Sequence, residues 1–308
     1  MQLPMNAKAA IDLHCDVPFH YREVSEVDYH MGTVTLGGSL PDKLEAIADA
    51  GFSGIELMEW DLQGSSVPVA RSMAEDLGLE IINYQPLRDF EGGPRDQLGP
   101  KLDRIERIFD CMEQLRTSTL ILCSNVSDVS DLDDNAVADD LALLGERAAA
   151  RGFSIGYEAL SWGLRVNTFR QAWRMIERSG AGNVGLVLDS FHTLALNDHF
   201  EDLSDVPPDR IALIQVSDAP RMDMDVKSWS RHHRCLPGEG DFDVAAFLAP
   251  VLANGYDGPI SLEIFNDHYK ARPPAPLARQ GMTALREVTL AAMLPAPREG
   301  RQFHEHRV

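Results

Sequence analysis

VGLVLD, residues 184–189, is an apolar segment that closes with a carboxylate, and three other segments in the second half of the sequence share this form. They are FSIGYE (153–158), IALIQ (211–215) and PISLE (259–263), so the closing side chains are Glu158, Asp189, Gln215 and Glu263. If the four segments are neighbouring parallel strands, these side chains converge at one end of the sheet. Three buried carboxylates repel one another, and a divalent metal ion is the simplest compensation.

The fold class follows from the alternation of short apolar runs with segments of helical periodicity, which is typical of βα units around a parallel sheet. The sequence has 308 residues, enough for one α/β barrel of about 250 residues. We count eight such units and predict a single-domain (β/α)8 TIM barrel. The predicted strands are residues 30–36, 54–58, 80–85, 119–123, 153–158, 184–189, 211–216 and 259–264.

Helices are predicted between these strands from apolar residues spaced by three or four positions. The clearest are residues 69–77, 98–115, 168–178, 244–254 and 277–293. A further helix is predicted after Ser39, which is a suitable N-cap, and another after Asp133. Residues 218–241 are predicted as a long loop on the carboxyl face of the barrel, where substrate contacts usually lie.

Two segments fall outside the predicted barrel domain, which we assign to residues 29–294 including the final helix. Residues 1–28 contain Pro4 and Pro18 and show no periodicity, so we interpret them as an irregular N-terminal arm. Residues 295–308 are predicted to form a C-terminal tail.

The charge balance excludes several classes of partner. With 28 Lys and Arg against 48 Asp and Glu, the net charge is −20, so we expect no binding to nucleic acid, which requires a cationic face.

No stretch approaches the roughly 20 apolar residues that cross a bilayer, and the N-terminus lacks the pattern of a signal peptide. The four cysteines form no C-x-x-C pair, which favours a reducing cytoplasm. The sequence leaves homo-oligomerisation open.

Each of the four strand-ending side chains, taken alone, could cap a helix or pair with an arginine. Their recurrence on four successive strands favours a metal site instead. Ligation by three carboxylates and one amide indicates Mg²⁺ or Mn²⁺, with Co²⁺ as a further candidate, because Zn²⁺ prefers His or Cys. Gln215 adds no charge, so the ion would be a stronger Lewis acid than with a fourth carboxylate.

Several longer motifs resemble one family, the bacterial 3-dehydroshikimate dehydratases, which belong to the xylose-isomerase-like sugar phosphate isomerase/epimerase TIM barrels. The motifs are YQPLRDFEG (84–92), YEALSWG (157–163), GLVLDSFHTLAL (185–196), QVSDAP (215–220), WSRHHRCLPGEGDFD (229–243) and SLEIFND (261–267). The resemblance implies that Glu158, Asp189, Gln215 and Glu263 hold one divalent ion. Some members carry a dioxygenase-like domain after the barrel, and from its length we expect this sequence to have none.

The implied reaction is loss of water from 3-dehydroshikimate, a small anionic cyclic keto acid, to give protocatechuate. His192 follows Asp189 by three residues in an expected strand-exit loop, where a neutral imidazole could transfer protons. The resemblance adds Ser230 and Arg234 as catalytic residues. It also implies that His232 and Arg234 contact the substrate, with Arg234 gripping a carboxylate or enolate oxygen. Arg88 is a second candidate for binding the anion. A structural hydrogen bond for His192, or solvent exposure for the arginines, is the alternative.

Two other functional classes remain open at this stage. An isomerase, epimerase or dehydratase acting on a ketose or keto-inositol would use the same metal, but typically has His where Gln215 stands. A non-catalytic barrel would leave the carboxylates unexplained. An endonuclease-type barrel would need further His ligands and a basic face. Glu56, within the second predicted strand, is expected to form a structural salt bridge or hydrogen bond.

Overall fold

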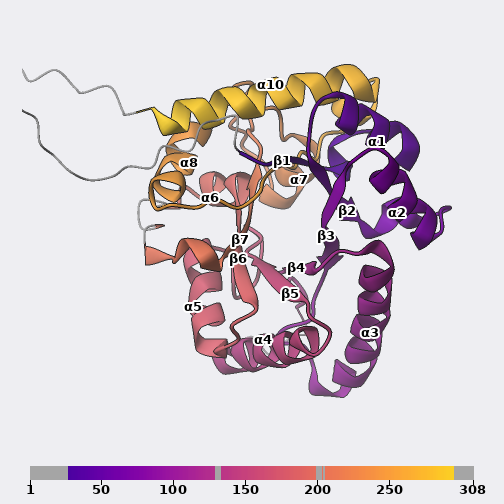
Figure 1. Cartoon of the computed structure of the whole chain (residues 1–308). Helices are drawn as coiled ribbons and strands as arrows, with labels where there is room; N and C mark the ends of the chain where they lie inside the picture. Colours follow the sequence, from indigo (N-terminus) through magenta and orange to yellow (C-terminus); the bar gives the residue numbers. More distant parts are fainter. Residues whose placement is uncertain (1–26, 129–132, 199–202, 204, 295–308) are drawn as a thin grey trace, which may run out of the picture.

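The computed structural model describes residues 27–128, 133–198, 203 and 205–294. Within them, parallel strands pair in chain order and close into a barrel (Figure 1). The strands are β1 (Tyr29–Gly32), β2 (Gly54–Met58), β3 (Glu80–Leu87), β4 (Thr119–Cys123), β5 (Ser154–Glu158), β6 (Val184–Asp189), β7 (Ile211–Val216) and β8 (Ile260–Leu262). The predicted (β/α)8 barrel is confirmed. The predicted tail, and the predicted arm up to residue 26, lie outside the described residues.

Helices surround the barrel and cover the outer face of its strands (Figure 1). The helices of the described chain are α1 (Leu40–Asp49), α2 (Val67–Asp76), α3 (Leu98–Leu115), α4 (Asp134–Ala149), α5 (Phe169–Ser179), α6 (Ser190–Ala195), α7 (Val226–His232), α8 (Val244–Ala253), α9 (Asp267–Lys270) and α10 (Pro274–Met293). The final helix α10 packs beside α1 and α8, so the end of the described chain returns to its beginning.

Local sequence signals explain where α1 and α5 begin and where α5 ends. Ser39 caps α1 in a capping box with Asp42, and Thr168 caps α5 in the same way with Gln171. Gly180 ends α5 with a φ of +66°, a conformation that glycine adopts without a steric penalty.

The first strand is shorter than the predicted residues 30–36. After Gly32 the chain turns into a 3-10 helix, η2 (Thr33–Thr35), in which both threonine side chains are buried. The hydroxyl of Thr33 donates to the carbonyl of Glu56, and that of Thr35 donates to the carbonyl of Leu262. These side-chain bonds to the neighbouring strands replace the ladder that a longer β1 would form.

The interior of the barrel is apolar at one end and polar at the other. Ile121, Val187 and Leu213 form a small buried cluster inside the strands. A Cβ atom at Gly156 would lie 2.8 Å from side-chain atoms of both Ile121 and Val187, so glycine is needed for this packing. Side chains two positions apart on a strand share a face, and Glu158 therefore also points into the barrel, nearer its carboxyl end.

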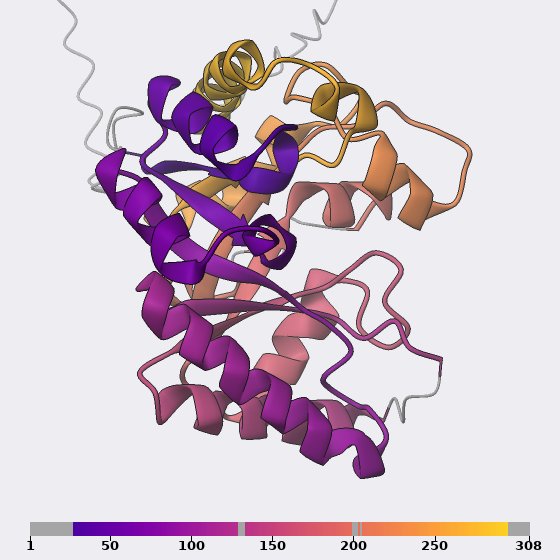
Figure 2. The same cartoon turned by 90° about the vertical axis from the view of Figure 1, so that its right-hand side faces the viewer.

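The connections that follow the strands gather at one end of the barrel, and the orange connection after β7 projects furthest (Figure 2). The structure corrects two predictions here. His192 lies in the short helix α6 and not in a loop, and the expected loop 218–241 contains α7. Over the described residues, no helix combines the length and apolar character that crossing a membrane requires.

Candidate active site

A pocket lies at the carboxyl end of the barrel strands, where TIM-barrel sites are built. The free space between its lining side chains is about 10 Å³, roughly what one water molecule needs. The lining residues are Met58, Trp60, Gln85, Pro86, Arg88, Cys123, Glu158, Leu160, Trp162, His192, Arg231, Arg234, Glu263 and Phe265. The lining thus combines apolar and aromatic side chains with carboxylates, an imidazole and three arginines.

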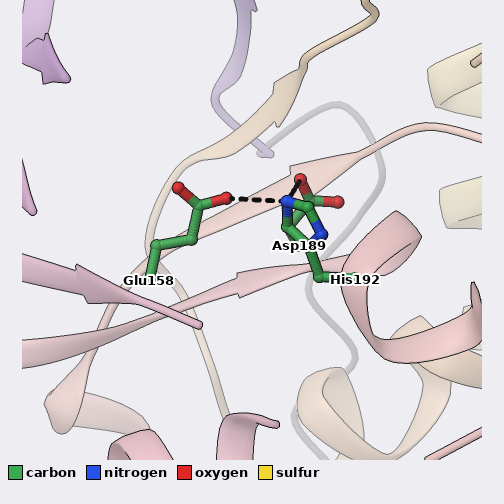
Figure 3. A group of neighbouring side chains, drawn as sticks. All are labelled: Glu158, Asp189 and His192. Atoms are coloured by element: carbon green, nitrogen blue, oxygen red, sulfur yellow. Dashed lines mark ion pairs between the residues drawn. The ribbon is translucent and has the colours of Figure 1, made fainter. Parts of the chain in front are cut away.

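Three polar side chains from neighbouring elements meet at the site, and two of them, Glu158 and His192, line the pocket (Figure 3). Glu158 ends β5, Asp189 ends β6, and His192 lies in α6. One ligand-type atom from each lies within 4.8 Å of those of the other two, and all three residues are buried. Nε2 of His192 is 3.4 Å from Oε1 of Glu158 and 3.6 Å from Oδ2 of Asp189. This group has the donors to hold a metal ion.

The surroundings of His192 favour its uncharged form. Nδ1 lies 3.0 Å from the hydroxyl of Ser161, and Nη2 of Arg234 lies 3.2 Å from Nε2. Because an arginine can only donate, Nε2 is the acceptor and the ring hydrogen is on Nδ1, directed at the hydroxyl. Burial lowers the pKa of His192 to about 3, against the opposing effect of Asp189. The Trp162 ring packs edge-on against the imidazole, with centroids 5.1 Å apart, and restrains its orientation. An uncharged imidazole can accept a proton at neutral pH.

Arg234 is buried among the carboxylates, with 1% of its surface exposed. Its Nη1 atom donates to Oδ2 of Asp189 at 2.7 Å and to Oε2 of Glu263 at 3.3 Å. Nη2 donates to the hydroxyl of Ser230 at 2.9 Å. Burial lowers the pKa of Arg234, but Asp189 and Glu263 outweigh burial and the pKa is raised. The guanidinium therefore stays charged and balances part of the acidic cluster.

Glu56 joins the same cluster from β2. Its Oε2 atom accepts hydrogen bonds from the side-chain amides of Asn83 at 3.0 Å, Gln85 at 2.9 Å and Gln215 at 2.8 Å. The amide of Gln85 also donates to Oε1 of Glu263 at 3.2 Å. The predicted hydrogen-bonding role of Glu56 is confirmed, while its link to Gln215 could not be seen in the sequence because the two residues are 159 positions apart.

The donor set is chemically able to hold a metal cation. Burial raises the pKa of Glu158 to about 7, and burial also raises the pKa values of Glu56 and Glu263. Oε1 of Gln215 and Oε1 of Glu56 are buried without a hydrogen-bond partner in the described part of the chain. A cation would lower the cost of ionised carboxylates and would use the free oxygen of Gln215.

The three residues predicted from the WSRHHR motif, Ser230, His232 and Arg234, lie in different surroundings in the structure. Ser230 is fully buried and its hydroxyl accepts from Arg234, whereas the His232 side chain is 50% exposed and lies 2.8 Å from Asp267. His232 does not line the pocket, but Arg231 does, although we did not single it out in the sequence. Successive residues of an α-helix point about 100° apart, so His232 faces roughly opposite to Ser230 on α7.

Asp218, just after β7, fixes the connection that carries α7. Its Oδ2 atom accepts from the backbone N–H groups of Gly238 and Gly240 at 3.0 Å each, and Oδ1 accepts from that of Phe242 at 3.0 Å. A Cβ atom at Gly240 would lie 2.3 Å from Oδ1 of Asp218. This close approach requires glycine. The hydrogen bonds of Asp218 anchor the connection, which therefore holds Ser230, Arg231 and Arg234 in fixed positions.

Comparison with known proteins places this chain in a family. The chain belongs to the xylose isomerase-like TIM barrel family, whose model matches residues 44–288. It is similar to a 3-dehydroshikimate dehydratase of Pseudomonas aeruginosa, with 52% identity over 258 residues, covering 83% of this chain and 40% of the relative. The chain therefore spans about two fifths of the length of that curated relative.

Solved structures show the same architecture. A xylose isomerase-like TIM barrel/4-hydroxyphenylpyruvate dioxygenase fusion protein has a TM-score of 0.82 and 49% identity, covering 84% of this chain and 42% of its own. The IolI protein, in a crystal structure with a zinc atom, has a TM-score of 0.77 and 20% identity, covering 85% of this chain and 98% of its own. The second likeness is one of fold.

Proposed function

We propose that this chain removes water from 3-dehydroshikimate to give protocatechuate, with a divalent metal ion as cofactor. The observation that carries the proposal is a small pocket in which buried carboxylates, an uncharged imidazole and arginines come together. The 52% identity to the dehydratase of Pseudomonas aeruginosa supports this substrate. The free thiols of Cys111, Cys123 and Cys235 agree with a reducing compartment, and we propose the cytoplasm.

We assign Glu158, Asp189, Gln215 and Glu263 as the residues that would hold the ion, with Mg²⁺ or Mn²⁺ as the first candidates. When bound, such an ion supplies a Lewis acid that stabilises negative charge developing on a ketone oxygen. His192 also belongs to the group that could bind metal. Because it lines the pocket and its Nδ1 atom holds the ring hydrogen beside the Ser161 hydroxyl, we assign its Nε2 atom to proton transfer instead.

The elimination requires a base for the proton beside the ketone and a proton for the departing hydroxyl. His192 accepts the ring proton at Nε2, and the imidazolium formed is stabilised by Glu158 and Asp189 at 3.4 and 3.6 Å. The same proton then passes to the leaving hydroxyl, which departs as water. Loss of a second ring proton, with protonation of the ketone oxygen, completes the aromatic diol without any net oxidation.

Arg234 and Ser230 take supporting roles in this proposal. The guanidinium is fixed by Asp189 and Ser230, so it presents a constant positive charge beside the reacting atoms. A charge that is already oriented needs no rearrangement as negative charge develops on the substrate. Ser230 thereby acts through Arg234 as a positioning residue.

The proposal is tested by incubating the chain with 3-dehydroshikimate and Mg²⁺ and separating the products by chromatography with ultraviolet detection. We expect one protocatechuate for each substrate consumed. A parallel reaction with a keto-inositol tests the isomerase or dehydratase alternative. Turnover of the keto-inositol together with no aromatic product from 3-dehydroshikimate would overturn the proposed function.

A further inference from the structure

Two arginines of the pocket have no acidic partner within the described residues. Arg88 directly follows β3 and Arg231 lies in α7, and both line the pocket. No hydrogen bond or ion pair involves either guanidinium in this part of the chain. Arg234, by contrast, is paired with Asp189 and Glu263. In a chain with a net charge of −20, two unpaired arginines in one pocket require an explanation.

Arg231 is held in place by aromatic rings. Its guanidinium carbon lies 5.4 Å from the ring centroid of Trp162 and 4.7 Å from that of Phe265. Stacking of this kind restrains the plane of the guanidinium and leaves its in-plane N–H groups free to donate. Both rings also line the pocket, so the arginine is preorganised beside the bound ligand.

The charge of Arg231 is only partly compensated in its surroundings. Burial lowers the pKa of Arg231, and the nearby charges of Arg88 and Arg234 lower it further, against a smaller opposing effect of Glu263. Arg234 already directs its N–H groups to Asp189, Glu263 and Ser230, so it has little capacity left for a second anion. An anion bound between Arg88 and Arg231 would remove the repulsion between them and satisfy both sets of donors.

We propose that Arg88 and Arg231 together form a carboxylate-binding subsite, which selects cyclic keto acids over uncharged keto sugars. The assignment deepens the proposed function and rests on it for the identity of the substrate. The apolar side chains of Met58, Leu160 and Trp162 supply the walls against which a carbon ring packs. In this proposal Arg231 binds the carboxylate, which leaves Arg234 the other role that the sequence offered it, next to the enolate oxygen.

The test compares two probes that share a ring diol and differ in charge, protocatechuate and 3,4-dihydroxybenzamide. Dissociation constants are measured by calorimetry with Mg²⁺ present for the unmodified chain, Arg231→Gln, Arg88→Gln and the double variant. Each single substitution is expected to weaken protocatechuate binding about 10- to 100-fold and to change benzamide binding less than about 3-fold. Because both arginines bind one group, the double variant should lose less than the product of the two single effects.

Arg221→Gln is the matched control, since it removes the same charge from the same connection at an exposed position outside the pocket lining. Arg231→Lys keeps the charge without the planar fork and should fall between the unmodified chain and Arg231→Gln. Circular dichroism spectra and melting curves show that each variant is folded. Equal losses for both probes, or equal losses in Arg221→Gln, would overturn the subsite. If inorganic phosphate displaces protocatechuate at a lower concentration than acetate does, and this competition is lost in Arg231→Gln, the assignment of the subsite to a carboxylate is wrong.

The outcomes separate this inference from the proposed function. If the unmodified chain turns over 3-dehydroshikimate but the arginine variants keep their preference for protocatechuate, only the subsite is wrong. If the chain shows no turnover but prefers the carboxylate through Arg88 and Arg231, the subsite stands and the reaction is wrong.

Discussion

Nε2 of Gln215 donates a hydrogen bond of 2.8 Å to Oε2 of Glu56, and this bond determines which way the Gln215 amide faces. Since the nitrogen is used by Glu56, the Oε1 atom is the end that remains buried without a partner in the described part of the chain. A side-chain oxygen oriented in this way is prepared to bind a metal ion. Residues that orient ligands without touching the metal commonly tune its affinity.

Glu56→Ala is therefore expected to weaken Mn²⁺ binding about 10- to 100-fold, as loss of an orienting partner typically does. The amide of Gln215 would lose the acceptor that fixes it. Glu56→Gln keeps a carbonyl oxygen at the same place and should retain most of the affinity. Calorimetric titration of the chelator-treated protein measures both variants. Equal Mn²⁺ affinities for Glu56→Ala and the unmodified protein would contradict this role.

Arg234→Met should destabilise the ion-free protein by about 3 kcal/mol, because it leaves Asp189 and Glu263 buried without their positive partner. A saturating divalent ion should recover part of that loss, since it binds the folded state. Urea unfolding with and without Mn²⁺ measures both effects. Arg147→Gln, which removes an exposed arginine 3.7 Å from Glu106, should cost less than about 1 kcal/mol. If Arg234→Met loses no more free energy of unfolding than this control, the charge-balancing role of Arg234 is refuted.

Glu91 lies outside the catalytic cluster and is buried in the connection after β3, with 1% exposure. Its Oε1 atom accepts from the backbone N–H of Asn125 at 2.6 Å and from the hydroxyl of Tyr157 at 3.0 Å. Burial raises the pKa of Glu91 from 4.5 to about 8, although both hydrogen bonds oppose this shift. The folded protein therefore holds a proton at neutral pH that the unfolded chain has released.

This shift predicts the direction of one pH dependence. Between pH 4.5 and about 8 the folded state binds more protons at Glu91 than the unfolded state, so its contribution to stability falls as pH rises. The whole fall, from well below the lower pKa to well above the higher one, amounts to roughly 5 kcal/mol. Glu91→Gln cannot ionise and should lose this part of the dependence. Urea unfolding at several pH values measures the slope, and parallel slopes for the two proteins would show that Glu91 does not titrate in this window.

His192→Asn should lower kcat about 100- to 10,000-fold while changing the dissociation constant of protocatechuate by less than about 3-fold, because only proton transfer is lost. His232→Ala provides the matched control. Its side chain lies beside Asp267 and outside the pocket lining, so its kcat should remain within about 2-fold. Initial rates of protocatechuate formation measure both variants. A large loss in His232→Ala would restore the role expected for that residue from the sequence alone.

Strand periodicity and strand-ending carboxylates were sufficient to predict the barrel and to indicate its functional end. Seven of the eight predicted strands begin and end within two residues of their positions in the structure. The errors arose where side chains replace backbone pairing, as Thr33 and Thr35 do after β1. A strand pattern carries no information on such long-range side-chain bonds.

The arrangement within the site was less predictable, because it depends on contacts between distant parts of the chain. Arg234 was expected to bind substrate, yet its nearest partner is Asp189, 45 residues away. Arg231 was overlooked because its sequence neighbours His232 and Arg234 are equally polar. A helical interpretation of residues 226–232 would have placed His232 and Ser230 on different faces.

The most direct test of the account is the rate of protocatechuate formation as Mn²⁺ is added back to chelator-treated protein. We predict almost no product without the ion and a rate that rises in proportion to bound Mn²⁺ until one ion is bound per chain. Full activity in the ion-free protein, or bound ion without any protocatechuate, would contradict the central claim.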